Sequence, residues 1–478
     1  MRYKAADIQL DLVFNKKGQH YPQSRITTLW GDVQATIDNK RAPEPFFFRA
    51  NSTQVIEYWL ANLVPAYYDL DDFQVRTPTD IVGQHIHLVK FDVTSSDGSA
   101  NGFNYEDGTL SPEEVRDLIE DINGAGGLFQ SFAFDSPKIL KAKTIPYFGD
   151  GGPGQKWLGA QATIQRWYAD PIVDNAGFDR TLRTVFTHDH FGPSTHQQVG
   201  LYAGLLVEPE GSKWQDALDD SIFLGTNLGR PDGADGNPPD DGGPTSWQAN
   251  IITSDEKDSY REFALEFQDR QLAYKRTSRA TPAEYKRYAD GPCPTGLPVM
   301  PPWGWADPDQ AINPANRPGT VSSGNCFVEP FPSIVTLSFQ NGTYSMSYRN
   351  ETPAIRVNGS PNVGSGAPTP EQTDLSHVFR SIKRFDPRLN IQPTGQINSS
   401  CPPGSPCFKY PPPQVGAEPL DPYTLLLRAY EGDQVQIRTL VGAHMSAHSF
   451  TVHGVNWLFE PTIFNAADNV SGYRGTQG

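Results

Sequence analysis

The chain has 478 residues, a formal net charge of −16 and a pI of about 5.0. Its lysines and arginines form no cluster of the kind that a phosphate backbone requires, which argues against a nucleic-acid partner. No apolar stretch approaches the roughly 18 residues of a membrane-spanning helix. Hydrophobic residues make up 37% of the chain, which is enough for packed cores and argues against disorder.

Strand patterns dominate the first 210 residues. Alternating or apolar segments that are rich in β-branched and aromatic residues predict strands over 7–14, 46–63, 161–168, 180–188 and 200–209. One helix is also predicted, because Ser111 and Glu114 form a capping box around Pro112, and Asn123-Gly124 is a stop signal. Since this helix lies between two strand-rich segments, it belongs to an insertion near 101–157.

Long loops and strands share the rest of the chain. Residues 211–255 are rich in Asp, Gly and Pro and predict a surface linker, after which strand patterns resume over 260–274, 333–339 and 424–441. The segments 47–64 and 426–441 resemble each other, because each has an apolar strand, a polar turn and an alternating strand before a histidine motif. We therefore expect an all-β protein with antiparallel β-sandwiches over 1–210 and 256–478.

Eight of the ten histidines lie in three short clusters. The clusters contain His85 and His87, then His188, His190 and His196, and finally His444, His448 and His453. In a strand, residues i and i+2 point to the same face, so each H-x-H pair aims two imidazoles at one point. Two such pairs in one predicted domain indicate a metal site. Imidazole suits copper, zinc, iron and nickel, so the ligand type alone does not name the metal.

The order of these motifs resembles that of multicopper oxidases, in particular the large ceruloplasmin-like and bacterial manganese-oxidising members. GQHIHLVKFD is similar to their first copper motif, and TVFTHDHFGPSTHQQVGLYAGLLVEP is similar to the second. The segments YREFALEFQD, SYRNETPAIRV and LLRAYEGDQVQIRTLV resemble strands of a following cupredoxin domain. The resemblance covers most of the chain and implies tandem cupredoxin-like sandwiches of Greek-key topology, with copper as the cofactor.

The resemblance also implies roles for individual residues. His85, His87, His188 and His190 would be ligands of a trinuclear copper cluster that reduces dioxygen, and His448 would help to hold a type 1 copper. No catalytic residue is expected beyond the copper ligands. Asp189 and His196 are candidates for contacts behind those ligands. Asp189 has two open interpretations, a proton relay or a turn hydrogen bond, and for His196 we favour a plain loop position. His20 and His377 are expected to be exposed, His444 to be structural and His453 not to be a ligand.

Two features depart from the family pattern. A type 1 site needs a cysteine thiolate, and none of the four cysteines has the required context; they are Cys293, Cys326, Cys401 and Cys407. Their even number in one loop-rich stretch fits two disulfides, which together with the family favours an extracellular or periplasmic location, although no signal peptide is visible. The chain also ends about where the Cys-His-Met part of the second domain would begin. We therefore expect that domain to be incomplete and further cupredoxin domains or subunits to be partners.

The leading hypothesis is an oxidase that transfers electrons to dioxygen from a reduced metal ion such as Mn(II) or Fe(II) (manganese oxidation or ferroxidase activity), or from a phenol. The alternative is a non-catalytic cupredoxin scaffold or subunit that contributes only half of a copper site. A cupin-type mononuclear enzyme ranks last, because the glutamate that should follow GQHIH is absent, with Lys90 and Asp92 nearby instead.

Overall fold

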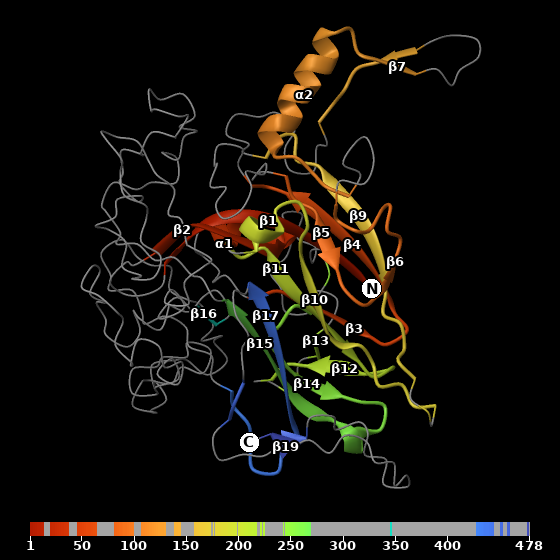
Figure 1. Ribbon diagram of the computed structural model, residues 1–478, viewed down its shortest axis with the longest axis vertical. Coiled ribbons are helices and arrows are strands. Elements are labelled where there is room, and N and C mark those ends of the chain that lie inside the picture. Colours follow the sequence, from red (N-terminus) through yellow and green to blue (C-terminus); the bar gives the residue numbers. More distant parts are fainter. Residues whose placement is uncertain are drawn as a thin grey trace.

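The structure is a computed structural model. It describes residues 1–13, 20–37, 45–64, 81–99, 107–130, 138–144, 157–173, 175, 177–197, 199–217, 220–221, 223–224, 242, 244–268, 345–346, 427–443, 450–452, 457–458 and 476–477. Over these residues the chain is mostly β with a few short helices, and three main sheets carry the fold (Figure 1). The all-β class expected from the sequence is confirmed. No helix in these ranges is long and apolar enough to cross a membrane.

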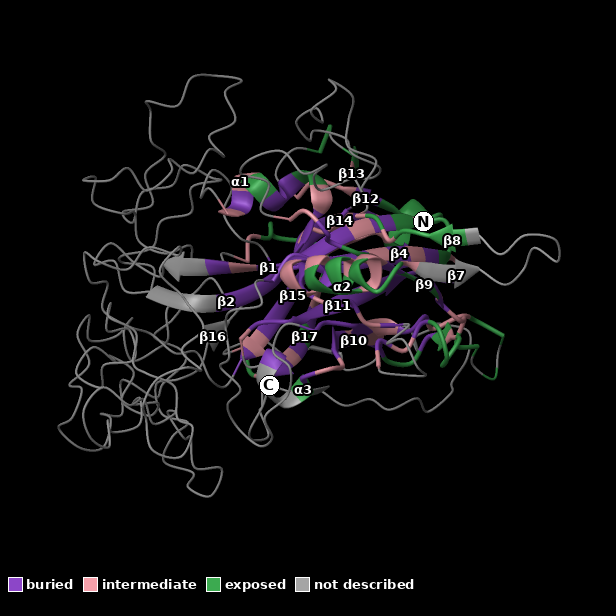
Figure 2. Ribbon diagram, turned by 90° about the horizontal axis from the view of Figure 1, so that it is seen from above, coloured by how far each residue is buried: buried purple, intermediate pink, exposed green. Residues whose placement is uncertain are grey.

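Two sheets pack face to face in the first half of the chain. The first sheet has the order β2-β1-β4-β9-β6 and contains β1 (Arg2–Val13), β2 (His20–Leu29), β4 (Val55–Asn62), β6 (Lys90–Phe91) and β9 (Ala162–Tyr168). The second sheet has the order β3-β11-β10-β5 and contains β3 (Phe47–Asn51), β5 (Gln84–Ile86), β10 (Arg183–Asp189) and β11 (Tyr202–Glu208). The buried rings of Phe48 from the second sheet and Trp167 from the first lie 5.2 Å apart, centroid to centroid. One shared core therefore joins the sheets into a sandwich (Figure 2).

The predicted helix forms where the capping box places it. It is α2 (Pro112–Gly124), and the amide of Glu114 donates to the Ser111 hydroxyl oxygen at 3.4 Å. The helix stands out beyond the sandwich together with the hairpin of β7 (Leu128–Gln130) and β8 (Lys138–Leu140), as Figure 1 shows. The short helices are η1 (Trp30–Asp32), α1 (Val33–Ile37), α3 (Pro193–His196) and η3 (Glu256–Asp258).

The third sheet has the order β13-β12-β14-β15-β16, and β17 also pairs with β15. It contains β12 (Lys213–Gln215), β13 (Phe223–Leu224), β14 (Gln248–Ile252), β15 (Tyr260–Gln268), β16 (Ser345–Met346) and β17 (Val435–Ala443). Three of these strands lie within 211–255, which the composition predicts to be a surface linker. The difference arises because Trp214, Trp247 and Ile251 are buried apolar anchors within a polar stretch. β18 (Trp457–Leu458) and β19 (Thr476–Gln477) pair separately.

Most strand pairs are antiparallel, as expected, but β1 with β4, β3 with β11 and β15 with β17 are parallel. β3 and β4 lie in different sheets, so the strand-turn-strand segment seen in the sequence at 47–64 is a crossover and not a hairpin. The turn at Asn51 closes with the amide of Gln54 donating to its carbonyl at 3.1 Å, and the Tyr430–Asp433 turn before β17 closes in the same way at the same distance. The division into two domains remains a prediction.

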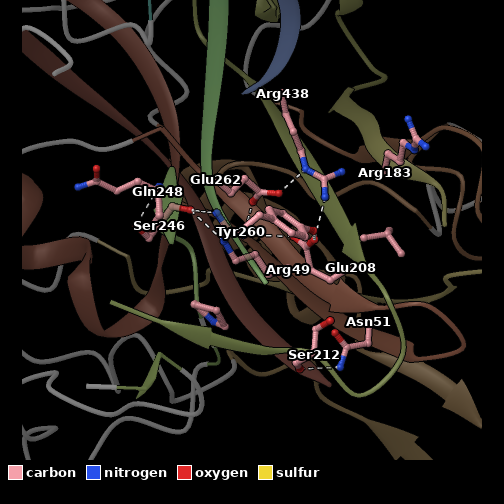
Figure 3. Close-up of polar contacts among 12 residues, drawn as sticks. Arg49, Asn51, Arg183, Glu208, Ser212, Ser246, Gln248, Tyr260, Glu262 and Arg438 are labelled. Atoms are coloured by element: carbon pink, nitrogen blue, oxygen red, sulfur yellow. Dashed lines mark hydrogen bonds and ion pairs between the residues drawn. The ribbon is translucent and has the colours of Figure 1, made fainter. Parts of the chain in front are cut away.

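Four buried charges hold the third sheet against the sandwich (Figure 3). Arg49 of β3 contacts Glu262 of β15 at 2.6 Å, Nη1 to Oε1, and Arg438 of β17 contacts Glu208 of β11 at 2.8 Å, Nη2 to Oε2. Arg438 also bonds Glu262 through its Nε. Burial raises the pKa of Glu208 to about 7, although both arginines act in the opposite direction. These contacts link the third sheet to the sandwich at a place from which water is excluded.

Candidate metal centre

The two H-x-H motifs meet on adjacent strands. β5 pairs with β10 in a register that places His85 directly opposite His188. Residues alternate in β10, so Val185 and Thr187 point into the sandwich while Phe186 and His188 point to its outer face. The ring centroids of His85 and His190 are 4.3 Å apart, and those of His87 and His188 are 5.3 Å apart. The structure therefore brings together all four histidines that the sequence predicts to be ligands.

A strained turn carries His87 to its position. The backbone at Leu88 has φ 61°, and the amide of Val89 donates to the carbonyl of His87 at 2.7 Å, which closes a γ-turn. A bulky residue rarely adopts this conformation, which costs on the order of 1–3 kcal/mol. The turn lets the chain leave β5 in one sheet and begin β6 in the other within a few residues. His87 stays beside β10, because its amide donates to the Phe186 carbonyl at 3.0 Å.

The nitrogen atoms face one another in a way that suits a shared ion. The Nε2 atoms of His87 and His188 are 3.1 Å apart. Two nitrogens that bind one ion at about 2.0–2.1 Å lie about 2.8–3.4 Å apart for ordinary bond angles. Without an ion, one of the two rings donates to the other. His85 joins this pair in a group of three imidazoles whose ligand nitrogens lie within 4.8 Å of one another.

Backbone and side-chain oxygens fix the other ring nitrogens. The Nδ1 atom of His188 lies 2.7 Å from the Asp189 carbonyl oxygen. The Nδ1 atoms of His85 and His190 lie 3.0 and 3.2 Å from the carbonyl oxygen of Asp97, and 3.1 and 3.4 Å from its carboxylate oxygens. A carbonyl oxygen accepts only from a protonated nitrogen, so this arrangement holds the Nδ1–H tautomer and leaves Nε2 free to bind a metal.

Asp97 was not found by sequence reasoning. It lies in a Ser-Ser-Asp-Gly segment, which has the composition of an ordinary turn. No spacing relative to the H-x-H motifs marks it. With His85 and His190 it also forms a second group of metal-binding type, two imidazoles and one carboxylate. The carbonyl contacts favour an orienting role for Asp97 over direct coordination.

The environment favours the neutral form of three of the imidazoles. Burial lowers the pKa of His188 to about 4, and the neighbouring rings of His85, His87 and His190 act in the same direction. Burial also lowers the pKa of His85 and of His87, again with other histidines contributing. A neutral imidazole offers the lone pair that a metal requires. At neutral pH these three imidazoles are therefore ready to bind a cation without first losing protons.

Asp189 and His196 lie together behind the histidines. Both are 1% exposed, and the His196 Nδ1 atom is 2.7 Å from the Asp189 carboxylate. Asp189 also accepts the amide of Gly192 at 2.7 Å, which matches the turn hydrogen bond considered from the sequence. His196 ends α3 and is buried, whereas the sequence favoured a plain loop position. The turn is compact enough to fold this residue back against β10.

Several candidates fall outside the described residues. They are His377, His444, His448, His453 and the four cysteines. His20 begins β2, and nothing is described of its side chain. The predictions for these residues, including the type 1 copper role of His448 and the disulfides, therefore remain predictions.

The similarities of this chain to known proteins lie among solved structures. No protein-family model and no curated protein matches the chain. Among solved structures, a copper nitrite reductase from Nitrosomonas europaea aligns with 44% of this chain and 42% of its own at 12% identity and a TM-score of 0.21. A multi-copper oxidase from Pseudomonas thermotolerans aligns with 44% of this chain and 30% of its own at 9% identity and a TM-score of 0.22. The chain thus spans less than half the length of either structure.

Proposed function

We propose that the protein binds copper through His85, His87, His188 and His190 and serves in an oxidase that passes electrons to dioxygen. The observation that carries the proposal is the convergence of four imidazoles from two H-x-H motifs, with two Nε2 atoms 3.1 Å apart. The donor set fits copper, since imidazole is one of its preferred ligands. Copper would supply one-electron chemistry, and this chain would bind and orient it.

The choice of copper over zinc and iron is supported by the order of the sequence motifs. The substrate class, a reduced metal ion such as Mn(II) or Fe(II) or else a phenol, rests on that resemblance as well. The acidic net charge of −16 is compatible with a cationic substrate. Dioxygen would be the electron acceptor and water the product.

A second candidate is a scaffold or subunit that supplies half of a copper site. The exposure of the cluster favours it, because His87 is exposed and the His190 side chain is 32% exposed. An open cluster leaves coordination positions for ligands from another domain or subunit. In that case the chain by itself should be copper-poor, colourless and inactive as an oxidase, and activity should return when a domain with a cysteine thiolate and further histidines is added.

Metal analysis of the purified chain tests the proposal. After loading with Cu(II) and removal of free metal, the unchanged chain should retain copper, and the double variant His188→Ala/His190→Ala should lose most of it. The matched control is His20→Ala/His377→Ala, which removes two histidines that lie outside the motifs. Equal copper content in the motif variant and the unchanged chain would refute the assignment. An intense blue band from the copper-loaded chain would show that a cysteine ligand has been misplaced.

A further inference from the structure

Asp189 stands between His188 and His190 in the sequence, but its side chain points the other way. Because alternate residues of a strand face opposite sides, the histidines lie on the outer face of the sheet and Asp189 lies inside the sandwich. It is 1% exposed. Its carboxylate accepts three hydrogen bonds, from the Gly83 amide at 2.9 Å, the Gly192 amide at 2.7 Å and the His196 Nδ1 atom at 2.7 Å.

These three donors come from both sides of the metal centre. Gly83 immediately precedes β5, which carries His85. Gly192 and His196 belong to the turn and to α3, which follow His190. A single carboxylate therefore connects the start of the first H-x-H motif to the end of the second one.

The short pairing between the motifs makes such a connection important. β5 and β10 are joined through the pairs Thr187–Ile86, His188–His85 and Asp189–Gln84. A slip by one residue would move the histidines of β5 to the opposite face. The amide of His190 donates to the Gly83 carbonyl at 2.8 Å, so Gly83 is held through both its amide and its carbonyl.

The space around Gly83 shows how closely this region is fitted. A Cβ atom at this position would lie 2.3 Å from the Gly98 carbonyl oxygen and 2.7 Å from that of Asp107. The Asp189 carboxylate therefore takes its three hydrogen bonds in a region that has no room for one more carbon atom at Gly83.

We propose that Asp189, itself held by His196, is a positioning residue that fixes the register and separation of the two H-x-H pairs and thereby sets their metal affinity. The proposal deepens the copper-binding function and rests on it. Asp189 acts through the backbone and does not contact the metal.

Substitution of Asp189 by asparagine provides the test. The asparagine side chain has the same shape as the aspartate, but one of its two oxygens is replaced by an NH2 group. This group cannot accept a hydrogen bond, so at least one of the three bonds from Gly83, Gly192 and His196 is lost. Copper affinity should fall about 10- to 100-fold, as is typical when the contacts that orient metal ligands are removed. The Cu(II) EPR spectrum should change, and in the metal-free chain the amide protons of Gly83 and Gly192 should exchange faster. His196→Gln removes one contact and should give a smaller loss of affinity.

The control is Asp7→Asn, another buried carboxylate, which accepts from Thr27 at 2.7 Å and acts on Asp189 only through space, without a hydrogen bond to either motif. It should leave copper affinity and the EPR spectrum unchanged. The inference is overturned if Asp189→Asn folds, by circular dichroism, and binds copper within twofold of the unchanged chain. If Asp189→Asn does not fold, normal affinity in His196→Gln overturns it instead. A lack of copper binding by the unchanged chain would refute the proposed function, and the exchange rates of Gly83 and Gly192 would still test the positioning role.

Discussion

One face of the β3-β11-β10-β5 sheet carries two polar clusters that are built in opposite ways. At one end, Arg49 and Glu208 meet Glu262 and Arg438 of the third sheet, and each charge has a partner of opposite sign (Figure 3). At the other end, imidazoles face imidazoles, and the Nε2 atoms of His87 and His188 lie 3.1 Å apart. In the first cluster the acidic and basic side chains pair with one another, whereas the second gathers imidazoles and is arranged for a cation. Polarity and burial alone therefore do not distinguish a structural cluster from a functional one; the complementarity of the groups does.

The largest effect is expected at the charged end. Glu262→Ala would leave Arg49 and Arg438 buried with Glu208 as their shared partner, which should cost about 3–5 kcal/mol in the free energy of unfolding. His87→Ala, at the exposed edge of the histidine cluster, should change it by about 0.5 kcal/mol or less in the metal-free chain. Urea titrations measure both values, and Glu57→Ala, which breaks an exposed ion pair with Arg2, serves as a control near or below about 1 kcal/mol. Equal costs for Glu262→Ala and His87→Ala would contradict the comparison.

The pH dependence of stability extends the comparison to Glu266, a buried acid without a basic partner among the described residues. Glu266 of β15 is fully buried, and neither carboxylate oxygen has a hydrogen-bond partner among the described residues. Burial raises its pKa well above the usual value. Its contribution to stability is therefore full below the unfolded pKa of about 4.3 and is lost as the pH rises toward the folded pKa. The glutamine in Glu266→Gln does not titrate. The free energy of unfolding of this variant should therefore rise relative to that of the unchanged chain by about 1.4 kcal/mol for each pH unit above the unfolded pKa.

Unfolding of both proteins in urea at pH 4, 5.5 and 7 measures this difference. Glu57→Gln is a control for which the pH dependence of the stability difference should have the opposite sign. Hydrogen bonds from Trp59 and then from Arg2 and Arg166 hold the pKa of Glu57 below its usual value, although burial opposes them. Its stabilisation is present above the unfolded pKa and is lost as the pH falls. A flat difference between Glu266→Gln and the unchanged chain across this range would mean that Glu266 has a partner that neutralises it.

A substitution of Asp97 shows whether this residue orients the histidine rings or binds the metal directly. Asp97→Asn keeps the backbone carbonyl that accepts from His85 and His190 and removes only the carboxylate charge. If Asp97 orients these rings, copper affinity should fall by about tenfold, and the nitrogen hyperfine pattern in the EPR spectrum should stay the same. A direct ligand would instead give a much larger loss together with an altered spectrum. A competition assay with a chelator measures the affinity.

A small change in stability, together with a loss of copper affinity, is expected at Leu88. Leu88→Gly relieves the left-handed backbone at φ 61° but gives the unfolded chain more freedom, so the free energy of unfolding should stay within about 1 kcal/mol. His87 would be held less firmly, and copper affinity should fall severalfold. Unfolding and metal titration are measured on the same preparation. A fall in both the free energy of unfolding and the copper affinity would indicate an ordinary packing role for Leu88. The control is Leu118→Gly on the exposed face of α2, which gives the cost of a leucine-to-glycine change away from the histidines.

The sequence predicted the parts of the molecule that depend on local patterns. The capping box at Ser111 located α2 to within one residue, and the i, i+2 spacing predicted that each histidine pair shares a face. What it missed depends on contacts between distant segments. β2 was not predicted, because Pro22 and polar residues interrupt its pattern, yet it pairs with β1 over most of its length. Asp97 and the Arg49–Glu262 contact likewise join residues whose proximity only the topology creates.

The parallel pairing of β15 with β17 has a consequence for how the protein is made. The sheet that carries the histidines is complete once β11 ends at Glu208, but β17 is complete only at Ala443. At typical rates of synthesis the interval is on the order of ten seconds or more. During that interval the face that β17 will contact, including Tyr202 opposite His188, has no cover from this strand. A nascent chain can thus meet a metal ion or a protein partner at the histidines before the third sheet closes beside them.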